Sequence, residues 1–428
     1  MMMVGLALRS MLARKLSLIL TVVTLALSVA LFLTIERLRV STRESFDGTI
    51  SGVDVLVGAR GSDLGLLLYT AFQIGDAAPS MRWTSFLDVQ ADDRVEWAVP
   101  ISLGDSHRGY RVIATTSDYF DFVRTGPNRP LGFDAQDPSL LSGFGVVLGS
   151  EVARALGYQM GDAITVQHGL ASAGDQSHDT QPFIVTGILT TTGTPIDYSL
   201  LLHIRAFEAI HEGWNGSVPG EPITRHEGVE DRTAVDLSGP EFEPSLLTAA
   251  YVGLMSKRRI FQFAEAIEDS GRAEPLTAVL PGITLSQLWL LLASADRALL
   301  TFSVLIVIAA LAGQMTLLVA TLDLRRREIA IYRAMGAQPQ TIAGLLVVEA
   351  GLISLASAVS GLVLTLIGTW LAGLWLGGAL KLDLNAVMVT PSQGLALLAF
   401  IGVSVVTGLV PALMAYRASL QDGMRARY

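Results

Sequence analysis

The stretch Arg325–Gly336, with the sequence RRREIAIYRAMG, is a short basic segment between two long apolar runs. Residues 298–322 before it and residues 350–380 after it carry no charged side chain. At about 1.5 Å per helical residue, each run is long enough to cross the ~30 Å hydrocarbon core of a bilayer. The sequence therefore predicts two membrane-spanning helices that are joined by a short basic loop.

The charge of this loop predicts the side of the membrane on which it lies. Its arginines lie close to the ends of both apolar runs, where positive charge favours the cytoplasmic side. We therefore expect the loop to face the cytosol. The four arginines are Arg325, Arg326, Arg327 and Arg333.

The same segment has the pattern of an amphipathic helix. Ile329, Tyr332 and Met335, with Leu322 or Leu324 before them, recur at steps of three and four residues, which predicts one apolar face with the arginines elsewhere. Gly336 suits a left-handed helix cap, and Pro339 suits the first turn of the next helix. Two interpretations follow. The helix is either a docking element for a partner or an anchor that lies on lipid headgroups.

Composition places the chain among membrane proteins. Of the 428 residues, 51% are hydrophobic and only 16% are charged, which is too apolar for an ordinary soluble protein of this length. Residues 38–296 contain 33 acidic and 17 basic residues, so a large acidic part is joined to a basic membrane part. The acidic excess argues against nucleic acid as a partner, and the absence of cysteine excludes disulfide and thiolate chemistry.

A further apolar run near the N-terminus predicts the first span. Residues 16–35 are uncharged and follow Arg9, Arg14 and Lys15, which favours a helix whose N-terminus is inside. A signal peptide is the alternative, but the run is longer than the usual apolar region and no cleavage pattern of small residues precedes Glu36.

The fold class expected from these patterns is a membrane protein with four transmembrane α-helices and one large α+β extracytoplasmic domain between the first two. The predicted parts are a cytosolic amphipathic segment 1–15, a first span 16–37, the domain 38–290, a second span 291–322, a cytosolic helix 323–338, a third span 339–376, an outer loop 377–390, a fourth span 391–415 and a cytosolic tail 416–428.

Runs rich in β-branched residues predict the strands of the domain. They are residues 53–57, 110–115, 145–148, 163–166 and 183–188, with strand character again at 247–255 and a last strand or linker at 276–285. Short helices are expected at 150–157, with Ser150 as its N-cap and Gly157 at its end, and at 261–267. The apolar run 64–72 is either a buried helix or an exposed lipid-handling surface.

Small residues in the spans predict close helix packing. Small side chains let helices approach closely in lipid, although glycines that simply face lipid are the alternative. The residues in question are Ser354, Gly361 and Gly368 at seven-residue steps in the third span, and Ser404 and Gly408 in the fourth.

No residue pattern predicts a catalytic, cofactor or metal site. His211 and His226 each begin like a zinc-protease HExxH motif, but Asn215 and Glu230 stand where the second histidine is required. Metal binding in the acidic loop 213–244 stays open as an alternative. Asp105-Ser106-His107 contains the residue types of a hydrolase triad, yet neighbours along a strand point apart and no G-x-S-x-G motif exists.

A phosphate-binding loop is also missing from the sequence. Such a loop needs a glycine-rich turn that ends in Gly-Lys-Ser/Thr. The lysines are Lys15, Lys257 and Lys381, and none has that context. Any ATP-dependent activity would therefore need a nucleotide-binding site outside this sequence.

The motifs together resemble the FtsX/MacB-type ABC transporter permeases. Residues 325–337, followed by Ile342 and Glu349, are similar to the family signature between the second and third spans, and so is the end from Pro411 to Arg425. Residues 147–162 and 183–189 are similar to its periplasmic core domain, and residues 7–15 to its N-terminal amphipathic segment.

This resemblance implies a dimer of four-span permeases, as a homodimer or a heterodimer, each docked to a separate cytosolic ATPase through the helix at 323–338. ATP and magnesium would be bound by that ATPase, and this chain would not be an enzyme. The coupling residues implied are Arg326, Arg327, Glu328, Ile331, Arg333, Met335 and Gly336. The implied location is the bacterial inner membrane, with both termini cytosolic and the domain periplasmic.

Three functions remain open. In the first, a mechanotransmission permease uses ATP hydrolysis to extract or export a hydrophobic, lipid-linked or peptide cargo, with membrane lipid and a periplasmic protein or lipoprotein as further partners. In the second, a non-transporting regulator or scaffold activates a periplasmic partner such as a cell-wall hydrolase. In the third, the chain is a membrane-anchored metalloenzyme.

Overall fold

The computed structural model describes residues 15–137, 140–168, 182–211, 232–269, 271–324, 326–380 and 389–425. Contacts divide the chain into two compact units. The helical unit falls within residues 1–41, 293–376 and 384–428, and the α/β unit within residues 42–292 and 377–383. The expected segment 1–15, the acidic loop 213–244 and the outer loop 377–390 lie wholly or partly outside the described residues.

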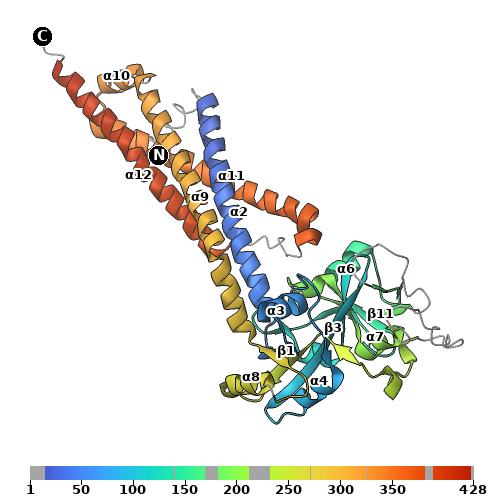
Figure 1. The fold of residues 1–428 in the computed structure, drawn as a ribbon. Helices are drawn as coiled ribbons and strands as arrows, with labels where there is room; N and C mark the ends of the chain where they lie inside the picture. Colours follow the sequence, from blue (N-terminus) through green and yellow to red (C-terminus); the bar gives the residue numbers. More distant parts are fainter. Residues whose placement is uncertain are drawn as a thin grey trace. The chain divides into compact units, whose positions relative to one another are not determined.

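Four long helices of the described chain are long and apolar enough to cross a membrane. Each contains one of the four expected spans, and a fifth, short helix α10 (Arg326–Ala334) follows the second of them (Figure 1). The long helices are α2 (Lys15–Thr49), α9 (Pro281–Leu324), α11 (Pro339–Leu380) and α12 (Pro391–Arg425).

Proline begins three of these helices, as its fixed φ angle and missing N–H favour. The expected strand or linker at 276–285 is therefore wrong in its second half, because α9 begins at Pro281. Pro411 lies inside α12, where it cannot donate a hydrogen bond to the carbonyl of Thr407 one turn earlier.

Apolar side chains from all four long helices form the core of the helical unit. Leu33 of α2, Leu311 of α9, Ile353 of α11 and Phe400 of α12 belong to one buried cluster. A second cluster joins α11, through residues such as Ile342, to Ala412 and Ala415 of α12. The helices therefore pack on one another through apolar contacts along their length.

The described residues of the α/β unit form one main sheet of eleven strands. Most neighbours are antiparallel, but β12 pairs in parallel with β4 and β11 with β8, which fits a mixed sheet. The main path is β15-β1-β14-β3-β4-β12-β8-β11-β7, with β10 on β3 and β9 on β11. Its strands are β1 (Val55–Ala59), β3 (Val95–His107), β4 (Tyr110–Thr115), β7 (Phe133–Gln136), β8 (Gly145–Leu148), β9 (Ala163–Ile164), β10 (Gln167–His168), β11 (Phe183–Leu189), β12 (Ser199–His203), β14 (Ala249–Leu254) and β15 (Leu276–Val279).

Helices and short elements cover this sheet (Figure 1). The helices are α3 (Asp63–Ala71), α4 (Trp83–Gln90), α5 (Asp118–Phe122), α6 (Ser150–Leu156), α7 (Ile204–His211) and α8 (Ile260–Glu268). Two pairs of two-residue strands stand apart from it, β2 (Met81–Arg82) with β13 (Leu246–Leu247), and β5 (Arg124–Thr125) with β6 (Arg129–Pro130). The short 3-10 helices are η1 (Pro195–Tyr198), η2 (Arg232–Ala234), η3 (Pro240–Phe242) and η4 (Lys257–Arg259).

The apolar run 64–72 forms the buried helix α3, which confirms one of its two interpretations. Leu66, Leu67 and Tyr69 are buried, and the side chain of Ser62 caps the helix by accepting from the N–H of Gly65. The run therefore belongs to the core, as most apolar runs in folded domains do.

The helix predicted at 150–157 is α6, and Gly157 ends it in the left-handed region at φ 73°. The predicted Ser150 cap is wrong, because Gly149 occupies the N-cap position. A Cβ on Gly149 would lie 2.4 Å from the carbonyl oxygens of Ile196 and Asp197, so only glycine fits there. Ser150 moves into the first turn of the helix instead.

Candidate functional site

The short helix α10 is the strongest candidate site in the chain. It begins two residues after the end of α9, and α11 begins at Pro339, only five residues after α10 ends. It contains Arg326, Arg327, Glu328, Ile331 and Arg333 of the expected coupling residues, while Met335 and Gly336 follow directly.

The end of α10 is fixed by two backbone hydrogen bonds. Gly336 has φ 91°, and its N–H donates to the carbonyl of Arg333 at 2.9 Å. The N–H of Ala337 donates to the carbonyl of Tyr332 at 2.9 Å. This pair of bonds is a Schellman motif, which requires a left-handed residue at the position of Gly336. The predicted cap is confirmed.

Two faces of α10 have different surroundings. Ile329 packs against the cluster that contains Ile342 and Ala412, whereas Ile331 and Met335 are 58% and 72% exposed. Leu322 packs against the same cluster as Ile329, so the predicted apolar face is confirmed for these two residues and wrong for Met335. Three-residue steps fall 60° short of a full turn, so Met335 lies about 120° around the helix from Ile329.

The exposed apolar pair has the spacing of two residues on one helix face. Ile331 and Met335 are four residues apart, and the N–H of Met335 donates to the carbonyl of Ile331 at 3.0 Å, so their side chains are neighbours at the end of α10. Glu328 and Arg333 are half-buried and have interaction partners. Arg326 and Arg327 form the first turn of the helix, and Arg325 lies outside the described residues.

A chain of hydrogen bonds joins three of the long helices. Ser404 of α12 lies 2.5 Å from the hydroxyl oxygen of Ser354 on α11 and 2.8 Å from the side-chain oxygen of Gln314 on α9. All three side chains are at most 2% exposed. Polar side chains inside a membrane bundle hydrogen-bond across helices in this way.

The glycines expected to pack between helices differ in their surroundings. A Cβ on Gly361 would lie 2.7 Å from Cγ1 of Val29 on α2, and one on Gly408 would lie 2.6 Å from Cβ of Ala350 on α11. A Cβ on Gly368 would have no atom of the described chain within 4 Å. Gly361 and Gly408 thus stand where two helices approach closely, and Gly368 does not.

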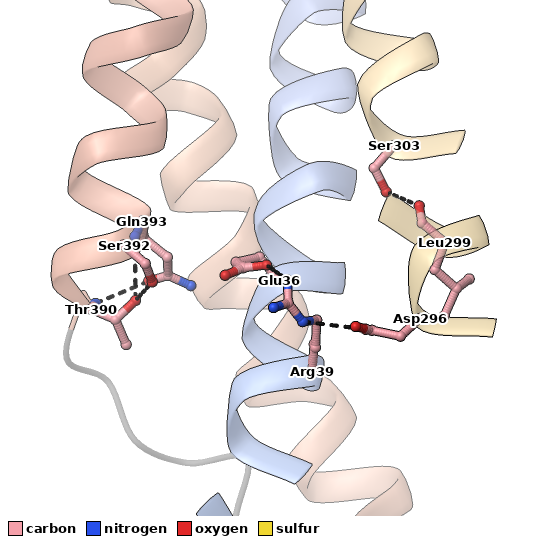
Figure 2. Close-up of polar contacts among 8 residues, drawn as sticks. All are labelled: Glu36, Arg39, Asp296, Leu299, Ser303, Thr390, Ser392 and Gln393. Carbon is pink, nitrogen blue, oxygen red and sulfur yellow. Dashed lines mark hydrogen bonds and ion pairs between the residues drawn. The ribbon is translucent and has the colours of Figure 1, made fainter. Parts of the chain in front are cut away.

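A polar group near one end of the helical unit was missed by sequence reasoning. Arg39 of α2 lies 3.1 Å from Glu36 on the same helix and 3.2 Å from Asp296 on α9 (Figure 2).

The N–H of Thr390 donates to Oε1 of Gln393 at 3.2 Å, and the N–H of Gln393 donates to the hydroxyl of Thr390 at 3.4 Å. This reciprocal pair is a capping box at the start of α12, and its Thr-x-x-Gln pattern is visible in the sequence.

The triad-like residues of the α/β unit are part of its core. His107 lies at the end of β3, with Nδ1 2.6 Å from the carbonyl oxygen of Thr165 and Nε2 2.9 Å from the hydroxyl of Tyr158. Burial lowers the pKa of His107, although the bond to Thr165 opposes this. Asp105 and Ser106 are also buried in β3, so the three residues are structural in this arrangement.

The described residues contain no group of three His, Cys, Asp or Glu side chains that could hold a metal ion. His226, Glu230 and most of the acidic loop lie outside them, and so does Asn215. Metal binding in that loop therefore stays an untested alternative.

Comparisons with known proteins agree with this organisation. Residues 18–268 match the family model of the MacB-like periplasmic core domain, and residues 300–420 match that of the FtsX-like permease C-terminal region. No curated protein matches the sequence.

Two solved structures are similar to part of this chain. One is the extracellular domain of the noncanonic ABC-type transporter YknZ from Gram-positive bacteria, with 14% identity, 53% of this chain and 98% of that chain covered, and a TM-score of 0.30. The other is the periplasmic region of MacB from Actinobacillus actinomycetemcomitans, with 10% identity, 56% and 94% covered, and a TM-score of 0.32. Because the MacB-like model alone matches more than half of the sequence, the chain belongs to the FtsX/MacB-type ABC transporter permease family.

Proposed function

We propose that this chain is a permease subunit of the mechanotransmission type, which couples ATP hydrolysis by a separate cytosolic ATPase to motion of its own extracytoplasmic domain. The observation that carries this proposal is the exposed apolar pair formed by Ile331 of α10 and Met335, the residue directly after α10. A capped helix between two spans presents these side chains where a soluble partner can reach them.

The surface of α10 has the composition of a docking site. Large apolar side chains that are desolvated by a partner contribute much of the binding energy of an interface, while charged residues around them add specificity and speed association. Ile331 and Met335 supply the apolar centre, and the arginines at 326, 327 and 333 supply positive charge. An anchor on lipid headgroups, the alternative, would use the same residues without a protein partner.

The connections of α10 support mechanical coupling. It lies two residues beyond the end of α9, and α9 is one unbroken helix that begins two residues after β15. The other helix that leads into the domain, α2, ends six residues before β1. Strands β1 and β15 pair with each other in the sheet. A displacement at α10 would thus reach a pair of neighbouring strands through continuous helix.

The proposal includes the expected topology and partners. The subunit would lie in the bacterial inner membrane with both termini and α10 in the cytosol, and would work as a dimer. ATP and magnesium would bind to the partner ATPase. The cargo would be hydrophobic, lipid-linked or peptide in nature, since the described spans contain few charged residues that could line a polar path.

The test is co-purification of the ATPase with the full-length chain from membranes. Ile331→Asp with Met335→Asp places two carboxylates in the proposed interface, and we expect it to abolish co-purification while insertion into the membrane is unchanged. Ile331→Leu with Met335→Leu keeps the apolar pair and serves as the matched control. Undiminished co-purification of the ATPase with the double Asp variant would refute docking on α10.

A second variant tests the charged part of the same surface. Reversal of Arg326 and Arg327 to Glu together with Met335→Asp is expected to have the same result. Reporters fused at Gly216 and Tyr428 test the topology independently, because we expect the first outside and the second inside. The opposite pattern would contradict the topology even if the ATPase still bound.

A further inference from the structure

Helices α2, α9 and α12 enclose an apolar groove in the helical unit. Its volume is about 260 Å³, and its lining residues are all apolar. An apolar cavity of about 150 Å³ is enough to hold benzene, so this groove has room for a longer hydrocarbon segment. Its lining includes Val29 and Leu33 of α2, Val307 and Leu311 of α9, and Ala396 and Phe400 of α12.

Gln393 lies one helical turn before the first groove residues of α12 and has an unused hydrogen-bond donor. It precedes the lining residues Ala396 and Leu397 by three and four positions, so it lies on the same face of α12. The residue is 1% exposed, and its Nε2 has no hydrogen-bond partner among the described residues. Its Oε1 accepts from the N–H of Thr390, which fixes the orientation of the amide. Figure 2 shows the amide pointing from α12 toward α2.

Arg37 supplies a second unused donor toward the same end. It follows the lining residue Leu33 by four positions on α2 and is 8% exposed, and its Nη1 has no partner among the described residues. The neighbouring Arg39 is different, because Glu36 and Asp296 already pair with it (Figure 2). Buried donors without acceptors are costly, so a ligand with acceptor oxygens would be stabilised here.

We propose that this groove binds one acyl chain of a membrane glycerophospholipid, with ester or phosphate oxygens of the same lipid accepting hydrogen bonds from Gln393 Nε2 and Arg37 Nη1. The apolar lining suits the acyl chain, and the guanidinium of Arg37 and the amide of Gln393 suit the head group. A transmembrane helix of a second copy would fit less well, because the carbonyls of a helix are already bonded within it. The site is independent of ATPase docking on α10.

The test uses the full-length chain in lipid nanodiscs that contain phosphatidylglycerol with a photo-activatable diazirine in one acyl chain. After illumination, labelled peptides are identified by mass spectrometry. We expect the label to concentrate on buried groove residues such as Leu33 and Phe400. Uniform labelling around the outer faces of the four spans would overturn the proposal.

Two variants and one control separate this site from general lipid contact. Ala396→Phe fills the groove and should remove the groove label, whereas Leu398→Phe changes a side chain that is 69% exposed on the same helix and should leave it unchanged. Gln393→Glu keeps the acceptor for Thr390 but removes the free donor. The loss of one hydrogen bond predicts an approximately threefold to tenfold fall in labelling.

The outcomes decide between occupants. Unchanged groove label in both Ala396→Phe and Gln393→Glu would overturn the proposal. Cross-links between groove residues and a second copy of the chain, without lipid label, would show that the groove is a dimer contact and would overturn it as well. If Ala396→Phe does not fold, the Gln393→Glu result decides alone.

Discussion

Ser404 on α12 lies 2.8 Å from the side-chain oxygen of Gln314 on α9, inside the helical unit. The hydroxyl of Ser354 on α11 extends this contact, and it lies 2.5 Å from both Ser404 and the carbonyl oxygen of Ala350. The hydroxyl groups of Ser354 and Ser404 thus have two protons for three contacts: with the Ala350 carbonyl, with each other and with Gln314. Nε2 of Gln314 has no partner among the described residues. The central hydroxyl of Ser404 connects the other two side chains.

We expect Ser404→Ala to destabilise the helical unit by about 1–2 kcal/mol, because it leaves the buried amide of Gln314 without a partner. Gln314→Leu combined with Ser404→Ala should cost less than the sum of the single changes, since both polar groups are then gone. Thermal unfolding in detergent measures all three variants. If the loss of stability in the double variant equals the sum of the two single losses, the two side chains are not coupled.

The close contact of Gly361 with α2 predicts a difference between two glycines of α11. Gly361→Ala places a methyl group 2.7 Å from Val29 and 2.9 Å from the carbonyl oxygen of Ala26, and overpacking of this kind costs about 1–3 kcal/mol. Gly368→Ala meets no atom of the described chain within 4 Å and should be neutral or stabilising by up to about 1 kcal/mol. Thermal stability in detergent compares them. A larger loss for Gly368→Ala would instead indicate that Gly368 faces another copy of the chain.

The cap of α10 predicts an effect on ATPase docking. Alanine at Gly336 would have to adopt φ 91°, which costs about 1–2 kcal/mol for a residue with a Cβ. We expect fraying of α10 and an approximately tenfold weaker association with the ATPase. Gly344→Ala in α11 is the control, because a Cβ there has no atom of the described chain within 4 Å. Equal affinity of both variants would show that docking does not depend on the cap.

Two histidines, the buried His107 and the half-buried His203, predict that the α/β unit loses stability in mild acid. Burial lowers the pKa of both His107 and His203 in the folded state, so the unfolded chain takes up protons first as the pH falls. This stability is fully present above the unfolded pKa of about 6.5 and is lost as the pH falls toward the lowered folded values.

Replacement of both histidines tests this pH dependence. His107→Gln with His203→Gln should lower stability at pH 8 but flatten its change between pH 7 and pH 5. Denaturant unfolding followed by tryptophan fluorescence measures both quantities. A pH profile that keeps its slope in the double variant would assign the effect to other groups.

Local patterns predicted much of this fold. The strands at 110–115 and 145–148 have the bounds of β4 and β8, because β-branched runs between turn residues leave little choice of structure. Strand β3 was missed although it has 13 residues, since Pro100 lies in its middle and proline usually marks the end or edge of a strand. Pairing with β14 on one side and β4 on the other stabilises it, and long-range pairing leaves no local pattern.

The candidate sites were less predictable than the helices that contain them. The sequence identified α10 and its cap, but the side that packs on α12 depends on which long helices are neighbours. Gln314 was not singled out, because a lone glutamine in an apolar run has no periodic pattern. Its partner Ser404 comes from a helix 90 residues further along the chain. Contacts of this kind depend on tertiary structure alone.

Pro411 makes α12 easier to bend at one position. The hydrogen bond that is missing at the Thr407 carbonyl weakens α12 at this position. Gly408, one turn before the core residue Ala412, has no side chain, which weakens the same part of the helix. The turns after Pro411 can bend at lower energetic cost than the membrane part before them. Ala412 and Ala415 in those turns belong to the cluster against which Ile329 of α10 packs. A force on α10 would therefore bend the end of α12 before it disturbs the hydrogen bonds of Ser404 with Ser354 and Gln314.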